Sequence, residues 1–314
     1  AEDGRPITQL ELVYGRVVLQ NVGEPGNPVN LIVGDAEKTV RLGAGARLAI
    51  EAVRQCIPRR DPLTDAVPVD ATVYAPAGDV TVETADGLIE VAEPARWNVT
   101  PQTEVELQPY ASPIAWLDEE PAERLELLAA EQLRTRLQPG VSAAIKLLEL
   151  SDNRRKEVRA LATRSGAYVG QFVPFVRELR DSEQRLSWNG HIETLRKALA
   201  LSPESAARVR ETLVDQLGTE AADDLFEMLR GYSLDDIGSN ANARQAGALD
   251  RLINFLESDQ LEYRVLAAYN LREITGKNLM QNPAANPGDR AQAVRRWRQR
   301  LAAGELAPQP GYGG

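Results

Sequence analysis

The hydrophobic pattern of this chain changes its period once, and that change limits the fold more than any other feature. Between residues 10 and 109, apolar and polar residues alternate in short runs that end at glycine, proline or asparagine about every eight residues. One such run, Val29, Leu31 and Val33, stops at Gly34. Period-two alternation is typical of antiparallel strands with one buried face. About nine such runs predict an all-β domain of the sandwich, barrel or jelly-roll kind.

A helical period takes over after residues 110 to 113. Leu125, Ala129 and Leu133 recur at helical spacing until Pro139 and Gly140 stop the pattern. The polar stretch 233 to 244 is expected to be a loop. Further amphipathic runs cover residues 141 to 150, 188 to 201, 249 to 257 and 261 to 276, and helix-start signals stand at Ser202-Pro203 and Asn286-Pro287.

Two of the helical segments share one pattern. Residues 261 to 276 place small and apolar residues at the same spacing as residues 158 to 170, and each segment ends at a glycine. Arg159 and Arg264 occupy matching positions. Each segment also follows a Ser-Asp pair, which contributes Asp152 to the first and Asp259 to the second. This self-similarity predicts a repeated helical unit.

The repeated pattern resembles HEAT repeats. Residues 157 to 162 and 172 to 181 carry the Val-Arg, alanine and paired aliphatic positions of one repeat, residues 249 to 267 carry a second, and residues 182 to 247 match poorly. In HEAT-like stacks the matching arginine bridges to an aspartate of a neighbouring repeat. The resemblance therefore implies a structural role for Arg159 and Arg264, with Asp152, Asp181 and Asp259 as available partners.

The strand-rich region has a resemblance of its own. The segments Leu12-Val13-Tyr14-Gly15-Arg16-Val17, Leu31-Ile32-Val33-Gly34-Asp35 and Ala77-Gly78-Asp79-Val80 look like parts of the FecR-type domain of bacterial envelope signalling proteins. The resemblance implies a location outside the cytoplasmic membrane, periplasmic or extracellular, and a role in sensing. Full FecR proteins also carry a membrane helix and a cytoplasmic anti-sigma segment, which this sequence lacks.

The predicted fold class is therefore α+β with two domains. Residues 1 to 112 form an antiparallel all-β, FecR-like domain, residues 113 to 304 form an all-α, HEAT-like repeat domain, and residues 305 to 314 form a flexible tail. A length of 314 residues agrees with two domains, since each can then bury its own core. No apolar stretch reaches the ~18 residues that a membrane helix needs.

Composition limits the classes of function. A net charge of −10 argues against a nucleic-acid-binding surface. The single cysteine, Cys56, excludes an intramolecular disulfide within the sequence and a zinc site built from several cysteines. His191 is the only histidine, and the sequence contains neither a Gly-x-Ser-x-Gly turn nor a phosphate-binding glycine loop. We therefore expect no enzyme activity, no cofactor and no metal.

Four further side chains are candidate contacts. Arg295 and Arg298 belong to an arginine cluster on the last predicted helix, which is either an anionic-partner surface or, as we favour, a solvated face with local ion pairs. Trp97 and Trp116 flank the change of period and are expected to seal a domain interface.

The sequence thus predicts a non-enzymatic, protein- or peptide-binding module of a bacterial cell envelope that senses or scaffolds, because stacked helix pairs leave an extended face for a partner. Two alternatives remain open. One is a structural component of an extracellular or envelope assembly, and the other is a hydrolase that uses His191. The sequence does not set the oligomeric state.

Overall fold

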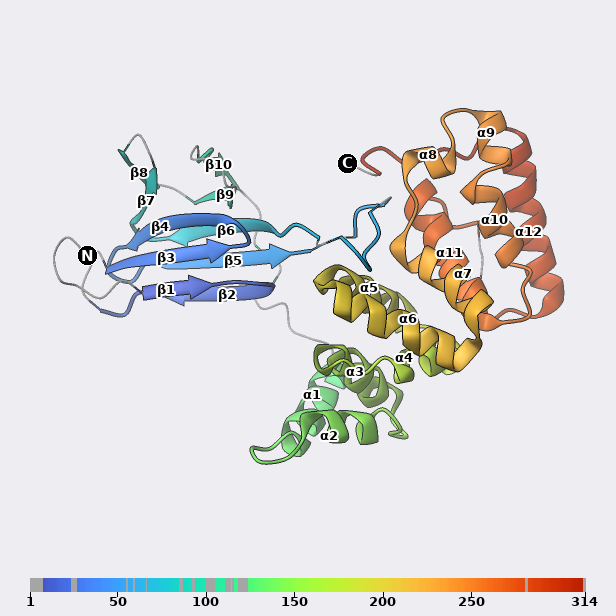
Figure 1. The fold of residues 1–314 in the computed structure, drawn as a ribbon, viewed down its shortest axis with the longest axis horizontal. Coiled ribbons are helices and arrows are strands. Elements are labelled where there is room, and N and C mark those ends of the chain that lie inside the picture. The colour runs from blue at the N-terminus through green and yellow to red at the C-terminus, as the bar shows by residue number, and fades with distance from the viewer. Residues whose placement is uncertain are drawn as a thin grey trace. The chain divides into compact units, whose positions relative to one another are not determined.

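The protein is described from a computed structural model, in which it divides into two compact units (Figure 1). The β unit comprises Ala1–Gln55 and Val67–Pro121, and the helical unit comprises Cys56–Ala66 and Ala122–Gly314. The structure describes residues 8–23, 27–54, 56–58, 60–65, 67–84, 87–91, 94–99, 105–110, 114, 116–117, 124–279 and 282–312.

Two five-stranded sheets form the described part of the β unit. The first has the order β1-β3-β4-β7-β8, and the second has the order β10-β9-β6-β5-β2. The strands are β1 (Thr8–Glu11), β2 (Gly15–Gln20), β3 (Asn27–Val33), β4 (Ala36–Leu42), β5 (Arg47–Val53), β6 (Asp70–Ala77), β7 (Val80–Thr84), β8 (Gly87–Val91), β9 (Ala95–Val99) and β10 (Gln108–Pro109).

The inner faces of the two sheets share one hydrophobic core. Leu31 and Val40 of the first sheet lie in the same cluster as Ile50, Val73 and Trp97 of the second. In β4 the burial alternates residue by residue, as the period-two pattern predicts. The unit is therefore a sandwich, and the predicted all-β domain is confirmed.

One strand pair departs from the antiparallel expectation. β1 pairs with β3 in parallel, with Leu10 opposite Leu31, whereas the other recorded pairs are antiparallel. After β1 the chain passes Gly15 (φ 111°) into β2, which joins the opposite sheet. An alternating pattern reports which face of a strand is buried, but not the direction of its neighbour, so sequence could not reveal this pair.

The helical unit follows in chain order. Its α-helices are α1 (Arg124–Arg136), α2 (Ala143–Leu150), α3 (Lys156–Gly166), α4 (Val173–Leu179), α5 (Trp188–Leu201), α6 (Pro203–Leu217), α7 (Thr219–Arg230), α8 (Leu234–Ile237), α9 (Ala241–Gln245), α10 (Ala248–Phe255), α11 (Leu261–Thr275) and α12 (Pro287–Ala302). The short 3-10 helices η1 (Ala167–Val169) and η2 (Ser182–Gln184) flank α4. The two-domain α+β class is thus confirmed.

Helix ends match the signals in the sequence. Ser202 and Asn286 cap α6 and α12 by accepting hydrogen bonds from the backbone N–H groups of Ser205 and Asp289. Gly276 ends α11 in the left-handed region at φ 65°. The two segments with matching patterns are helical, and each packs beside a neighbouring helix, α3 against α2 and α11 against α10.

Residues 233 to 244 are not the loop that their polarity suggested. They contain α8 and α9, and Ser233 forms a capping box with Asp236 at the start of α8. Helices of one turn depend on their caps more than on an apolar stripe, so a search for hydrophobic periodicity passes over them.

The C-terminal residues pack on the helical unit, although a flexible tail was expected. The Leu306 side chain is fully buried in the helical core. The backbone N–H of Gln309 donates to the Ile274 carbonyl at 2.7 Å, and the Tyr312 hydroxyl donates to the Tyr232 carbonyl at 2.8 Å. The absence of periodicity excluded a helix here, but anchoring needs only one apolar side chain and a few hydrogen bonds.

The proline-rich loop between β5 and β6 also packs on the helical unit. Cys56 and Leu63 contact its core, and the Cys56 thiol lies 3.7 Å from the Arg196 carbonyl. The helical unit therefore includes Cys56–Ala66, a segment that the predicted boundary at residue 112 assigned to the β domain.

Candidate functional site

Helix α2 lies at one end of the helical unit (Figure 1), and its outward side carries exposed aliphatic side chains. Ile145 is 59% exposed and Leu148 is 46% exposed, and Val141, which lies two residues before α2 begins, is 44% exposed. On the other side of α2, Leu147 and Leu150 are buried against α1 and α3. We call the three exposed residues the α2 outer face.

A helix at the end of a helical unit normally presents a polar outer surface, because no further helix covers it. Here the end pair α1–α2 presents leucine, isoleucine and valine instead, and Leu125 and Leu128 of α1 are also about half exposed. Contiguous exposed apolar surface is typical of a protein interaction site.

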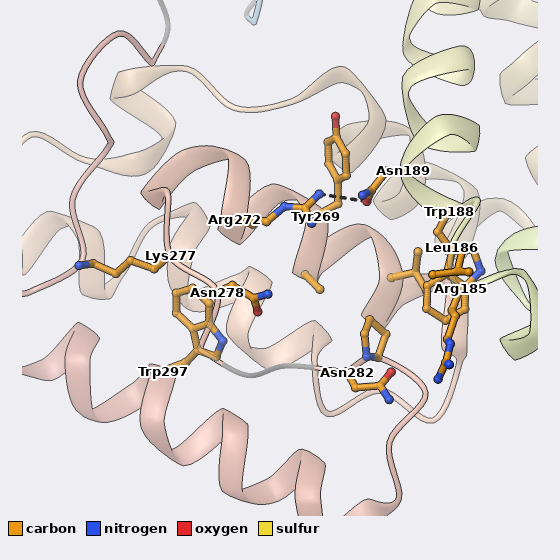
Figure 2. Close-up of a pocket in the computed structure, with 13 residues that line it drawn as sticks. Arg185, Leu186, Trp188, Asn189, Tyr269, Arg272, Lys277, Asn278, Asn282 and Trp297 are labelled. Atoms are coloured by element: carbon orange, nitrogen blue, oxygen red, sulfur yellow. Dashed lines mark hydrogen bonds between the residues drawn. The ribbon is translucent and has the colours of Figure 1, made fainter. Parts of the chain in front are cut away.

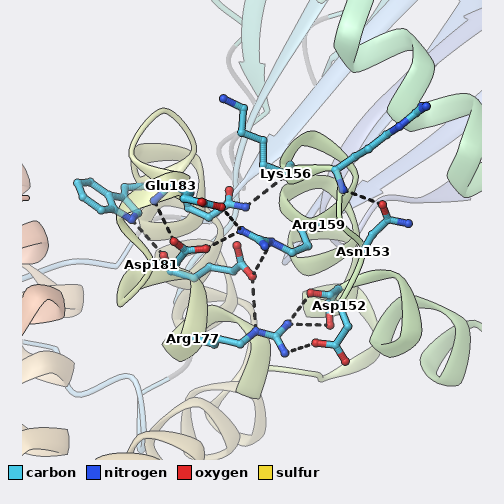
Figure 3. A network of polar contacts seen from close by, with 12 residues as sticks. Asp152, Asn153, Lys156, Arg159, Arg177, Asp181 and Glu183 are labelled. Carbon is cyan, nitrogen blue, oxygen red and sulfur yellow. Dashed lines mark hydrogen bonds and ion pairs between the residues drawn. The ribbon is translucent and has the colours of Figure 1, made fainter.

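Arg159 lies in a network of charged side chains between α3 and the residues after α4 (Figure 3). Its guanidinium donates to the Asp181 carboxylate at 2.5 Å and lies 3.6 Å from the Glu178 carboxylate. Asp152 pairs with Arg177 instead, which also donates to the Ser151 carbonyl at 2.5 Å. The sequence thus identified an arginine–aspartate bridge, with Asp181 as the partner of Arg159.

Glu178 is the buried member of this network, with a side chain only 1% exposed. Burial raises the pKa of its carboxyl, and the nearby Arg159 and Arg177 oppose that rise. The Trp188 indole donates to the Glu178 backbone carbonyl at 3.1 Å, which links the network to α5. These contacts join α3, α4 and α5, so their role is structural.

Arg264 bonds to backbone carbonyl oxygens, whereas the sequence predicted an ion pair with an aspartate side chain. It is 7% exposed and donates to the carbonyls of Ser258, Asp259 and Pro283 at 2.7 to 2.8 Å. Burial lowers its pKa, and the positive charge of Arg290 adds to that effect. The predicted bridge to the Asp259 side chain is replaced by bonds to carbonyl oxygens, because the turn before α11 and the segment before α12 close around the guanidinium.

The two tryptophans flanking the change of period have different settings. Trp97 is 2% exposed within the sandwich core, on β9. The Arg16 guanidinium carbon lies 5.3 Å from the centre of the Trp116 ring. Trp97 is thus a core residue of the β unit, which gives it a different role from the predicted interface seal.

The arginines of α12 also differ from one another. Arg298 pairs with Glu257 at 2.7 Å and donates to Asn254 at 3.0 Å, so its contacts are local. Arg295 is exposed. Trp297 points inward and is 2% exposed. The preferred prediction of a solvated face with local ion pairs holds for Arg298.

His191 lies inside the helical core. Its side chain is fully buried, its ring meets the edge of Phe175, and neither ring nitrogen has a hydrogen-bond partner in the described part of the chain. Burial, with a smaller contribution from Arg164, lowers its pKa to about 3. This geometry gives the hydrolase hypothesis no support, since a general base must reach its substrate.

A pocket that the sequence did not reveal lies in the helical unit (Figure 2). Its volume is about 290 Å³. Residues of α5, α11 and α12, together with residues before α5 and between α11 and α12, line it, so no local sequence motif identifies it. We call it the α5–α11 pocket.

The fold defines a protein of two units, a β-sandwich and an all-helical unit. Comparisons with models of protein families, with curated proteins and with solved structures found no match. Among the described residues, no helix has both the length and the apolar character to cross a membrane.

Proposed function

We propose that this protein is a non-enzymatic protein-binding module, a sensor or scaffold, which takes its partner on the α2 outer face. One observation carries the proposal: an end helix of the stack is apolar on two sides and has only one side covered. The partner that fits presents an apolar helix or strand, because three aliphatic side chains offer no hydrogen bond.

Burial of this face against a partner contributes only a modest binding free energy. Complete burial of an aliphatic side chain contributes about 1.5 to 3 kcal/mol, and these three residues are already about half covered. Full coverage therefore contributes roughly 3 kcal/mol, which is too little for a lasting complex by itself. The partner contact extends over neighbouring surface, and the exposed Leu125 and Leu128 of α1 supply more apolar area.

The setting that we propose is the bacterial cell envelope. The resemblance of residues 10 to 109 to FecR-type domains supports it, and the described strands of that region fold as a sandwich. Cell fractionation tests this part separately. Recovery of the full-length protein with the periplasmic or outer-membrane fraction is the expected result, and recovery only with the cytosol contradicts it.

The binding proposal is tested by photo-crosslinking from position 148. Leu234 on α8 is 49% exposed and Leu148 is 46% exposed, so position 234 is a matched control. A crosslinking amino acid at 148 should trap a distinct protein in the native cells that the same group at 234 does not trap. Leu148→Glu should raise the Kd of that purified protein at least about tenfold, while Leu234→Glu leaves it unchanged.

Equal crosslinking from both positions contradicts the proposal. Light scattering then separates a partner-binding module from the alternative of a building block. A building block self-associates through its own apolar face, and Leu148→Glu returns it to a monomer. A partner-binding module is a monomer before and after the substitution.

A further inference from the structure

We propose that the α5–α11 pocket binds a small organic carboxylate with an aromatic or aliphatic body. The pocket lies on different helices from the α2 outer face, so this inference is independent of the proposed function. Three properties of its lining support it: positive charge without neutralising carboxylates, indole walls, and a size that suits a small ligand.

The lining is cationic although the whole chain carries a net charge of −10. Arg185, Arg272 and Lys277 contribute to it, and the described residues that line it include no aspartate or glutamate. Within the described residues, none of the three forms an ion pair, whereas Arg159, Arg196 and other arginines of the helical unit do. A cluster of cations without counter-charges attracts an anion.

Arg272 is the cation that the protein holds in place. Its guanidinium donates to the Asn189 side-chain oxygen at 3.0 Å and lies 5.6 Å from the centre of the Tyr269 ring (Figure 2). These contacts leave other N–H groups of the planar guanidinium available for the two oxygens of a carboxylate. Arg185 stands on the segment before α5, and in Figure 2 the Lys277 side chain points away from the other labelled residues.

The walls favour a ligand with an apolar body. Trp188 and Trp297 are 5% and 2% exposed, and Val265 and Ala268 add aliphatic surface. The Trp297 indole N–H is buried and has no hydrogen-bond partner among the described residues. Phosphate ion would meet the cations but gain nothing from two indoles, whereas an aryl or alkyl carboxylate uses both.

The volume limits the ligand. About 290 Å³ lies near the lower end of the range for small-molecule pockets, which is roughly 300 to 1,000 Å³. The pocket therefore takes one ring or one side chain together with its carboxylate. Such a group belongs either to a free acid or to the C-terminal residue of a peptide. Both present a carboxylate next to an apolar body.

Calorimetry and tryptophan fluorescence of the full chain test the inference with four probes. These are phenylacetate, the uncharged phenylacetamide, inorganic phosphate, and acetyl-leucyl-phenylalanine with a free C-terminal carboxylate. Phenylacetate or the dipeptide should bind, should change the emission of Trp188 and Trp297, and should bind more weakly as salt increases. Tighter binding of the dipeptide identifies a peptide terminus as the source, and equal or tighter binding of phenylacetate identifies a free acid.

The variants Arg272→Gln and Arg185→Gln each remove one charge from the pocket. Arg272→Gln should raise the Kd of the bound carboxylate about tenfold, and the double variant should raise it further. Arg208→Gln on α6 changes the net charge equally outside the lining and should leave the Kd unchanged. Arg185, Arg208 and Arg272 are exposed, so the variants should keep the parent melting temperature.

Four results would overturn the inference, and three of them are comparisons of affinity. They are equal binding of phenylacetamide and phenylacetate, tighter binding of phosphate than of either carboxylate, and a loss of affinity in Arg208→Gln as large as in Arg272→Gln. Absence of binding by all four probes also rejects it.

Discussion

Removal of Arg159 should destabilise the helical unit by about 3 kcal/mol. Its hydrogen bond to the Asp181 carboxylate joins two charged groups, and such a bond contributes roughly 1.5 to 3 kcal/mol. Arg159 is only 18% exposed, so solvent replaces it poorly. Its loss also leaves the buried Glu178 carboxylate with Arg177 as the remaining nearby cation, which adds to the cost. For a unit of this size the melting temperature should fall by roughly 6 to 12 °C.

The pH dependence separates this mechanism from lost packing. The folded-state pKa of Glu178 is raised above the ordinary value of 4.5, so the folded protein binds more protons than the unfolded chain between those two values. Stability therefore increases as pH falls through the folded pKa toward 4.5. The positive charge of Arg159 lowers the Glu178 pKa, so its removal should raise that pKa further. The deficit of Arg159→Ala should therefore be smaller at a pH near 4.5 than at about pH 7.

Thermal melting followed by circular dichroism provides the measurement. Arg154→Ala is the control, since Arg154 is exposed on the neighbouring loop, and it should melt with the parent. In the double variant Arg159→Ala/Glu178→Gln, the neutral amide should recover part of the lost stability. Equal melting temperatures for Arg159→Ala and the parent, or a deficit that is the same at both pH values, would refute the reasoning.

Three further predictions concern the helical unit. Gly276→Ala should lower the free energy of unfolding by about 1 to 2 kcal/mol, because φ is 65° and the new Cβ would lie 2.7 Å from the Gln309 side-chain oxygen. Gly288→Ala, near the start of α12, is the control and should lower it less. Equal urea midpoints for the two variants would contradict this prediction. Leu306→Ala should cost about 2 to 4 kcal/mol, whereas a free tail would tolerate it in the same titration. Burial raises the pKa of the Cys56 thiol to about 11. Iodoacetamide at about pH 8 should therefore label Cys56 far more slowly in the native protein than in the urea-unfolded chain. Equal labelling rates would show that the loop that carries Cys56 does not pack on the helical unit.

Sequence periodicity located the strands and the longer helices, because burial on one face imposes period two on a strand and about 3.6 residues on a helix. Cap residues fixed several ends, as Ser202, Asn286 and Gly276 show. The Arg159 bridge was also predictable, since the HEAT resemblance implied an arginine–aspartate pair. The matching Arg264 bonds to carbonyl oxygens, because the backbone that surrounds it comes from two separate segments.

The candidate sites were much harder to predict. The α2 outer face requires knowledge of which side of an apolar helix its neighbours cover, and the sequence of α2 shows only that both sides are apolar. The α5–α11 pocket combines residues about ninety positions apart, such as Asn189 and Lys277, so no spacing rule connects them. Which side chains are exposed, and which distant residues meet at one pocket, is decided only when the chain packs.

The sequence by itself determined the two kinds of secondary structure, the change between them near residue 110, and the repeated arginine-bearing helix, because each depends on neighbours within a few turns. Tertiary structure alone decided the parallel pairing of β1 with β3, the packing of residues 56 to 58, 60 to 65 and 304 to 312 on the helical unit, and the convergence of arginines and indoles in the α5–α11 pocket. These features depend on contacts between distant segments, and their energy becomes available only once the surrounding elements have packed.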